Sequence, residues 1–291
     1  DLMNDYWTPS KAGAIIDNNA AEIASEINRQ SARWGSPDSL AWRDQVHDLK
    51  EFHVVRRIYQ RNQIEEYFGL NNQVDLSLRV QPAEAGVIHI NSIIPKTYPW
   101  AGIYFDGNPV TITAVANPGY TFDHWENNLG LDTLGTSFTL NLTSYSNFTA
   151  VFTGSAQPVE LELSEINYHS DPTLDASDWV EIHNVADYPI DLTEYKVQDR
   201  DWFNAYPIPA GTILMPDERL VVVEDDAKFA AVYPGVLNKA GSTFFSYDNS
   251  GDQVRLLDRK GVTVLQSTYD DQAPWPCTPD GFGRTMERKS G

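Results

Sequence analysis

The first 70 residues show the apolar spacing of α-helices. Thr8 followed by Pro9 is typical of a helix start, because the Thr side chain can cap the first turn and proline suits the first helical position. Gly35-Ser36-Pro37 predicts the end of that helix, and Asp38 or Ser39 can cap the next one. The spacing continues to Phe68, where Gly69 is suited to a left-handed helix end. The apolar residues that share a helical face are Ile16, Ala20, Ile23 and Ile27, then Trp42, Val46, Leu49, Phe52, Tyr59, Ile64 and Phe68.

This apolar stripe is rich in large side chains for a unit of only two or three helices. We therefore expect residues 1–70 to pack against something else.

From residue 71 to 153 the hydrophobic period changes to two, which is typical of β-strands. The expected strands are 74–80, 87–91, 110–116, 138–142 and 148–152. Turn signals separate them, among them Asp106-Gly107-Asn108-Pro109 and Asn117-Pro118-Gly119. The pattern predicts a small β module.

A short linker, 153–158, leads into many short strands. They are expected at 159–167, 179–184, 192–198, 219–224, 253–258 and 262–268, with one or two helical turns at 225–233. Regular short strands with glycine and proline between them indicate a β-sandwich. The fold class expected is a multidomain, mainly β protein with an N-terminal helical segment.

The acidic charge argues against nucleic acid as a partner, and the single cysteine excludes disulfides and multi-cysteine zinc sites. The 291 residues carry 21 Lys+Arg against 41 Asp+Glu, a formal charge of −20, and residues 158–291 hold 11 basic and 24 acidic side chains. This acidity argues against nucleic-acid binding, which needs Lys and Arg at the phosphates. The single cysteine, Cys277, excludes an internal disulfide and a multi-cysteine zinc site.

No segment is apolar over the length of a membrane span. The start, Asp1-Leu2-Met3, lacks a charged-then-apolar leader, so we expect no signal peptide in this chain, and a first residue of Asp suggests a processed product.

The last unit resembles the lamin tail domain. The matching residues are 163–168 (LSEINY), 178–184 (DWVEIHN), 190–192, 209–212, 220–225, 250–256 and 269–276, in the order of that family. The resemblance implies an immunoglobulin-like sandwich over 159–291.

The middle unit, 71–153, is similar to the divergent internalin-type bacterial repeat. The likeness is carried by 100–105 (WAGIYF), 110–120, Phe122, Trp125 and the closing 149–152 (TAVF).

Residues 1–70 resemble the end of a CotH spore-coat kinase-like domain, through Arg33-Trp34, Trp42, Val46, Phe52, Arg56, Arg57 and 67–70 (YFGL). This order of three units is one that secreted bacterial CotH-like proteins show. The resemblance implies an extracellular or cell-envelope location.

The sequence lacks the motifs that carry kinase chemistry. Phosphoryl transfer needs a loop over the phosphates, a lysine, a catalytic Asp and metal-binding carboxylates. The chain has no glycine-rich loop with a following lysine and no His-Arg-Asp, and 280–282 reads Asp-Gly-Phe rather than Asp-Phe-Gly. If the parent is a kinase, we expect its active site upstream of Asp1.

We therefore predict no catalytic residue, no cofactor and no metal. The six histidines lack helical metal-site spacing, and the acidic pairs Asp270-Asp271 and Glu224-Asp225-Asp226 are interpreted as solvated turns. One alternative stays open, a calcium turn at Asp248 and Asp252, although it offers few of the 6 to 8 oxygens that Ca²⁺ prefers. A hairpin turn explains the same residues.

The leading functional hypothesis is a non-catalytic accessory region that binds, anchors or positions. Its partner would be a protein or a cell-envelope polymer or glycan. The first alternative is part of an active kinase-like phosphotransferase whose catalytic core lies upstream. The second is a carbohydrate-binding module that uses exposed aromatic residues, with Trp202 and Trp100 as the candidate contacts.

Overall fold

The computed structural model describes residues 1–132 and 135–288. The chain divides into two compact units, Asp1–Gly154 and Ser155–Gly291. Each unit is described by itself. The whole is a multidomain, mainly β protein with N-terminal helices and an immunoglobulin-like sandwich, which confirms the expected fold class.

Three helices open the first unit, α1 (Pro9–Ile23), α2 (Ile27–Trp34) and α3 (Ser39–Phe68). The expected caps are confirmed: Thr8 accepts from Lys11 N, Asp38 accepts from two backbone amides at the start of α3, and Gly69 is left-handed with φ 63°. The segment expected as one helix is instead interrupted between Ile23 and Ile27, where neither glycine nor proline marks the break.

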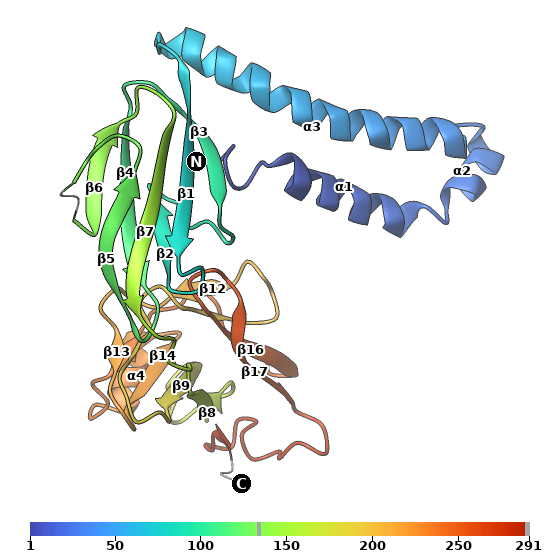
Figure 1. Ribbon diagram of the computed structural model, residues 1–291. Helices are drawn as coiled ribbons and strands as arrows, with labels where there is room; N and C mark the ends of the chain where they lie inside the picture. The colour runs from blue at the N-terminus through green and yellow to red at the C-terminus, as the bar shows by residue number, and fades with distance from the viewer. Residues whose placement is uncertain (133–134, 289–291) are drawn as a thin grey trace. The chain divides into compact units, whose positions relative to one another are not determined.

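The helices pack chiefly on one another. α1 and α3 run side by side as a hairpin (Figure 1), and the Lys50 ammonium lies 2.9 Å from the Asp17 carboxylate across it. We refer to α1, α2 and α3 as the helical hairpin.

The β module consists of two sheets around one core. Its strands are β1 (Gln73–Gln81), β2 (Gly86–Ile90), β3 (Trp100–Phe105), β4 (Pro109–Ala116), β5 (Tyr120–Asn127), β6 (Ser137–Asn141) and β7 (Ser146–Gly154). One sheet has the order β3-β1-β7-β5, with β1 and β7 parallel, and the other has the order β2-β4-β6. Alternate residues of both sheets fill the core, including Leu76, Leu78, Ile88, Ile112 and Phe148. The periodicity did not predict β3 or β5.

A buried polar contact joins the helical hairpin to the β module. Asn4 exchanges two hydrogen bonds with the backbone of Ile103 in β3, at 2.8 and 3.1 Å. The side-chain oxygen of Asn4, Oδ1, also accepts a hydrogen bond from the guanidinium of Arg61 at 2.8 Å, and both side chains are buried. Burial, and the nearby charge of Arg57, lower the pKa of Arg61 and so disfavour its charged form. The hydrogen bond to Asn4 helps to stabilise the buried guanidinium.

The second unit is a sandwich of two sheets. Its elements are β8 (Leu161–Asn167), β9 (Trp179–Asn184), β10 (Ile190–Asp191), β11 (Lys196–Gln198), β12 (Ala205–Pro207), β13 (Ile213–Leu214), β14 (Arg219–Val223), α4 (Asp226–Val232), β15 (Lys239–Ala240), β16 (Gly251–Leu257), β17 (Thr263–Asp270) and β18 (Met286–Glu287). One sheet has the order β15-β14-β9-β8-β18, the other β12-β11-β16-β17, and β10 pairs with β13.

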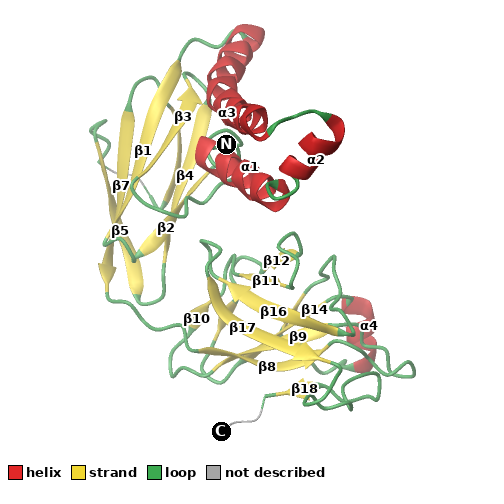
Figure 2. Cartoon of the chain, turned by 90° about the vertical axis from the view of Figure 1, so that its right-hand side faces the viewer, coloured by secondary structure: helices red, strands yellow, loops and turns green. Residues whose placement is uncertain are grey.

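The core of the sandwich lies between these two sheets, and Figure 2 shows β16 and β17 lying over β8 and β9. Val180 and Ile182 of one sheet meet Val254 and Leu256 of the other in this core. The far side of β9 and β14 is covered by α4, whose Phe229 packs against Trp179. Both faces of β14 beyond Arg219 are therefore buried, which explains its unbroken apolar run.

We expect Asn4→Ala to loosen the attachment of the helical hairpin, because it leaves the buried Arg61 guanidinium without its acceptor. The free energy of opening of residues 1–8 should fall by ~1–3 kcal/mol. Hydrogen exchange of the N-terminal peptide measures this. Asn18→Ala, on the exposed face of α1, is the matched control, and equal exchange in the two variants would contradict the assignment.

Candidate functional site

The helical hairpin exposes large apolar side chains. Over its 30 residues α3 buries only Arg61, although helices normally hide one apolar face. In the middle of α3, Phe52 is 57% exposed, Ile58 58% and Tyr59 60%, with Val54 and Val55 also exposed. Because successive helical residues point about 100° apart, these five side chains fall within an arc of about 160° and form one broad face of the helix. We call them the α3 apolar surface.

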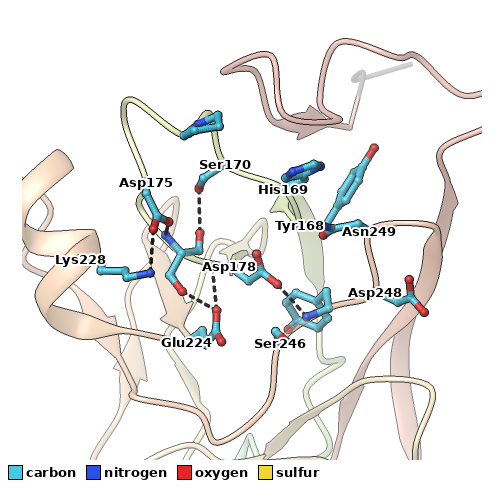
Figure 3. Close-up of a pocket in the computed structure, with 13 residues that line it drawn as sticks. Tyr168, His169, Ser170, Asp175, Asp178, Glu224, Lys228, Ser246, Asp248 and Asn249 are labelled. Atoms are coloured by element: carbon cyan, nitrogen blue, oxygen red, sulfur yellow. Dashed lines mark hydrogen bonds and ion pairs between the residues drawn. The ribbon is translucent and has the colours of Figure 1, made fainter.

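A polar pocket lies at one end of the sandwich in the second unit. Its volume is about 550 Å³, and it is lined by the loop that joins β8 to β9, by the start of α4 and by residues 246–249. In Figure 3 the carboxyl group of Asp178 points into this hollow, with Glu224 below it and His169 above. We call it the sandwich-end pocket.

The strand pairing brings Asp178 and Glu224 together. β9 and β14 are antiparallel with Trp179 opposite Val223, so the preceding and following residues face each other where the pairing ends. The backbone N–H of Glu224 donates to the carbonyl of Asp178 at 2.8 Å, and the backbone N–H of Asp178 donates to Glu224 Oε2 at 3.2 Å. The Ser177 hydroxyl donates to the same Oε2.

Asp178 is the most perturbed acid of the pocket. It is 9% exposed, and its Oδ2 accepts a 2.8 Å hydrogen bond from the backbone N–H of Tyr247. The pKa of Asp178 is raised to about 7, chiefly by burial and to a lesser degree by the nearby Glu224, while the Tyr247 hydrogen bond and His169 oppose the rise. Asp178 therefore changes charge near neutral pH.

Lys228 and His169, which also line the pocket, each lie against a carboxylate. Lys228 of α4 lies 2.7 Å from Asp175, and the Lys228 bond holds the pKa of Asp175 below its usual value. His169 Nδ1 lies 2.6 Å from the carboxylate of Asp280. These pairs fix the walls of the pocket on either side of Asp178.

The proposed calcium turn lies beside this pocket. Asp252 is buried, and its two oxygens accept from the backbone N–H groups of Arg200, Gln253 and Asp248. Asp248 Oδ1 accepts from the backbone and hydroxyl of Ser250, which lowers the pKa of Asp248. Across residues 1–132 and 135–288, no three His, Cys, Asp or Glu side chains converge as metal ligands. The calcium turn stays a prediction.

The two candidate tryptophans occupy different environments. Trp100 is partly buried against the core of the β module, and a Cβ at Gly102 would lie 2.4 Å from its ring. A larger residue at position 102 would force this ring to move, and the ring itself packs against the core. Trp202 is 70% exposed and lies against Phe203, with ring centroids 3.7 Å apart. Gln198 donates to the carbonyl of Trp202 at 2.8 Å and steadies this loop.

Sequence reasoning missed the role of Asp178 and misjudged Glu224. Glu224 lies half-buried in the pocket rather than in a solvated turn, because it faces Asp178 across two paired strands. The available signal was polar residues directly flanking two buried strands, Asp178 before Trp179 and Glu224 after Val223.

Two family models match parts of the chain. Residues 154–271 match the Lamin Tail Domain, and residues 78–156 match the Divergent InlB B-repeat domain. Both resemblances expected from the sequence are thereby supported. Neither match reaches residues 1–77. Among curated proteins, none matches the chain significantly.

Similarity to solved structures is low. A DUF4876 family protein from Bacteroides thetaiotaomicron VPI-5482 is 11% identical, with a TM-score of 0.24 over 64% of this chain, and the chain spans 66% of that protein's length. A DUF3823 family protein from Parabacteroides merdae ATCC 43184 is 10% identical, with a TM-score of 0.17 over 68% of this chain and 98% of the other. Neither likeness bears on the fold.

We expect the stability of the sandwich to fall as pH rises from about 4 to about 7. The pKa of Asp178 is higher in the folded chain than in the unfolded one, so the stabilising proton is fully held at low pH and is lost through pH 7. The loss is roughly 2–4 kcal/mol, from about 1.4 kcal/mol per pKa unit. Asp178→Asn should remove this loss. Between pH 5 and pH 8 the free energy of unfolding of the variant should therefore rise relative to that of the wild type.

Urea-dependent hydrogen exchange of the β9 and β14 amides measures the effect, with variant and wild type compared at each pH. Asp187→Asn, at an exposed position, is the control. A difference between Asp178→Asn and wild type that is the same at both pH values would contradict the assigned pKa.

Proposed function

We propose that this chain is a non-catalytic accessory region of a secreted CotH-like protein, located outside the cell or in its envelope. Residues 1–70 would end the kinase-like domain, 71–153 would form the repeat module, and 159–291 the lamin-tail sandwich. The two matched families are of immunoglobulin-like and repeat types, which supports a binding or positioning role.

The α3 apolar surface carries this proposal. At about 1.5 Å per residue, the surface from Phe52 to Tyr59 extends about 10 Å along the middle of the 30-residue helix. Exposed apolar side chains gathered on one part of a helix mark a contact surface, because leaving them in water forgoes about 25 cal/mol per Å². Its occupant would be the kinase-like domain that precedes these helices in CotH-like proteins, so the helical hairpin would position that domain relative to the β units.

Among the helices of the described parts of the chain, none combines the length and the apolar character needed to cross a bilayer. The net charge of −20 favours a soluble polymer or protein as the partner over nucleic acid.

We expect Phe52→Ser combined with Ile58→Ser to weaken docking of the purified kinase-like domain at least tenfold, about 1.4 kcal/mol. Both side chains are already exposed, so the free energy of unfolding should stay within about 0.5 kcal/mol of the wild type. Titration calorimetry measures the docking. Leu237→Ser, 86% exposed on the second unit, is the control.

Two results would count against the accessory role. One is unchanged docking in the double variant. The other is ATP turnover or autophosphorylation by this chain alone, which would favour the phosphotransferase alternative.

A second candidate function rests on the Trp202–Phe203 pair. Both rings are exposed, at 70% and 67%, on a loop held by Asp199, which accepts from the backbone of Asp201 and the amide of Asn204. Paired aromatic rings on a fixed loop offer a flat apolar face of the kind that stacks on sugar rings.

On a glycan array, a carbohydrate-binding role predicts retention of specific glycans that Trp202→Ala loses by about tenfold or more. Phe244→Ala, 69% exposed elsewhere on the same unit, should retain them. An array on which the two variants and the wild type behave alike would remove this candidate.

A further inference from the structure

Residues 272–288 return along the border of the sandwich, and we call this segment the strap. It begins where the lamin-tail match ends, at residue 271, and leads from β17 to β18, the outermost strand beside β8 (Figure 2). The strap belongs to the second unit, so its role is independent of the docking proposed for the α3 apolar surface of the first unit.

The strap is held on the sandwich at two places. At the first, Asp280 and Gly281 bond to the ring and to the carbonyl of His169, at 2.6 and 3.1 Å. At the second, β18 pairs with β8 over Met286 and Glu287, although β8 is seven residues long. The greater part of the β8 edge is therefore not paired with β18.

Most of the strap lies away from the core. Thr285 and Arg288 add hydrogen bonds to β8, and Met286 packs partly buried against the core. Of residues 272–288, however, only Pro279 is buried, and two hollows of about 380 and 430 Å³ lie along the path of the strap. Segments with few buried apolar contacts open at a low free energy.

A row of three glutamates crosses the strands where the strap pairs. Glu165 of β8 lies opposite Glu181 of β9 on one side and opposite Glu287 of the strap on the other. Arg219 lies 3.2 Å from Glu181, whereas no Lys, Arg or His among the described residues forms an ion pair with Glu165. Like charges directly opposite each other across strands are destabilising. Glu287 therefore weakens the pairing that holds the strap.

We propose that the strap leaves β8 reversibly and that the uncovered edge of β8 binds an extended peptide in which a basic residue follows an apolar one. The peptide adds to the sheet through its main chain, as the strap does. Its apolar side chain takes the place of Met286, and its basic side chain faces Glu165 where the strap presents Glu287. Charge complementarity thus favours the peptide over the strap.

The surroundings of Met286 and Glu287 set the chemistry of the peptide. The hollow of about 380 Å³ beside Met286 is lined by Leu163, Ile166 and Leu265, so it admits a bulkier apolar side chain. An acidic peptide would meet the repulsion that Glu287 meets. The strap of a second copy also presents Glu287, so it has no advantage over the chain's own strap.

Hydrogen exchange of the full chain tests the opening. The reporter is the protection factor of the Arg288 amide, which is bonded to β8. Glu287→Lys should raise it about threefold to tenfold, because repulsion from Glu165 is replaced by attraction. Met286→Ser should lower it about tenfold, because the apolar contact is lost. Asp187→Lys, the same charge change at an exposed position elsewhere on the sandwich, should leave it unchanged.

Peptide uptake tests the site itself. The probes are the labelled peptide of residues 281–288 (GFGRTMER) and the same peptide carrying Glu287→Lys. Fluorescence anisotropy measures their binding to the full chain with Met286→Ser, whose own strap is weakened. The lysine peptide should bind about threefold or more tighter than the glutamate peptide. Uptake of both should fall in the full chain with Glu287→Lys, whose strap is tightened.

Equal binding of the two peptides would overturn the proposal. So would an Arg288 protection factor that Glu287→Lys leaves unchanged, or uptake that is the same in the chains with weakened and tightened straps. Because Glu287→Lys strengthens the closed state, misfolding does not account for the expected result. The kinase-like domain is absent from these measurements, so their failure leaves the docking role of the helical hairpin standing.

Discussion

The antiparallel pairing of β9 with β14 is the constraint on which the sandwich depends. Because side chains alternate, Val180 and Val222 enter the core between the sheets while Trp179 and Val223 point to the other side, against α4. A one-residue slip would exchange these two sets and place each against neighbours that it does not fit. The same register decides what stands where the pairing ends, and there it places Asp178 opposite Glu224.

The helical hairpin lacks an equivalent constraint. Its order comes from local capping, from the Lys50–Asp17 ion pair and from the Asn4–Arg61 contact. Exposed ion pairs contribute about 0–1 kcal/mol each, and helix caps about 1 kcal/mol. The hydrophobic contribution that stabilises most helices is largely unused here, because the apolar side chains of α3 face outward. The chain thus joins two β units with complete cores to a helical element whose apolar surface is left uncovered.

Local features of the fold were predictable from the sequence and non-local ones were not. Thr8, Asp38 and Gly69 act within one helical turn, so their identities suffice to place helix ends. The central strands of both units follow from alternation. β3 was missed because Gly102 interrupts its apolar pattern, and the reason for that glycine, the ring of Trp100, is visible only in the structure. Likewise, the sequence shows Asp178 and Glu224 as two acids 46 positions apart, and only the strand pairing makes them neighbours.

The pocket and the α3 apolar surface have a common physical origin. In each, the fold orders groups whose favourable interactions it does not complete: apolar area on α3, and negative charge at the end of the sandwich. A buried negative charge is stabilised only by a cation that fits its geometry, whereas apolar surface can be covered by any partner of complementary shape. The α3 apolar surface can therefore be covered by any partner of complementary shape, whereas the raised pKa of Asp178 records the cost of burying a charge within the sandwich.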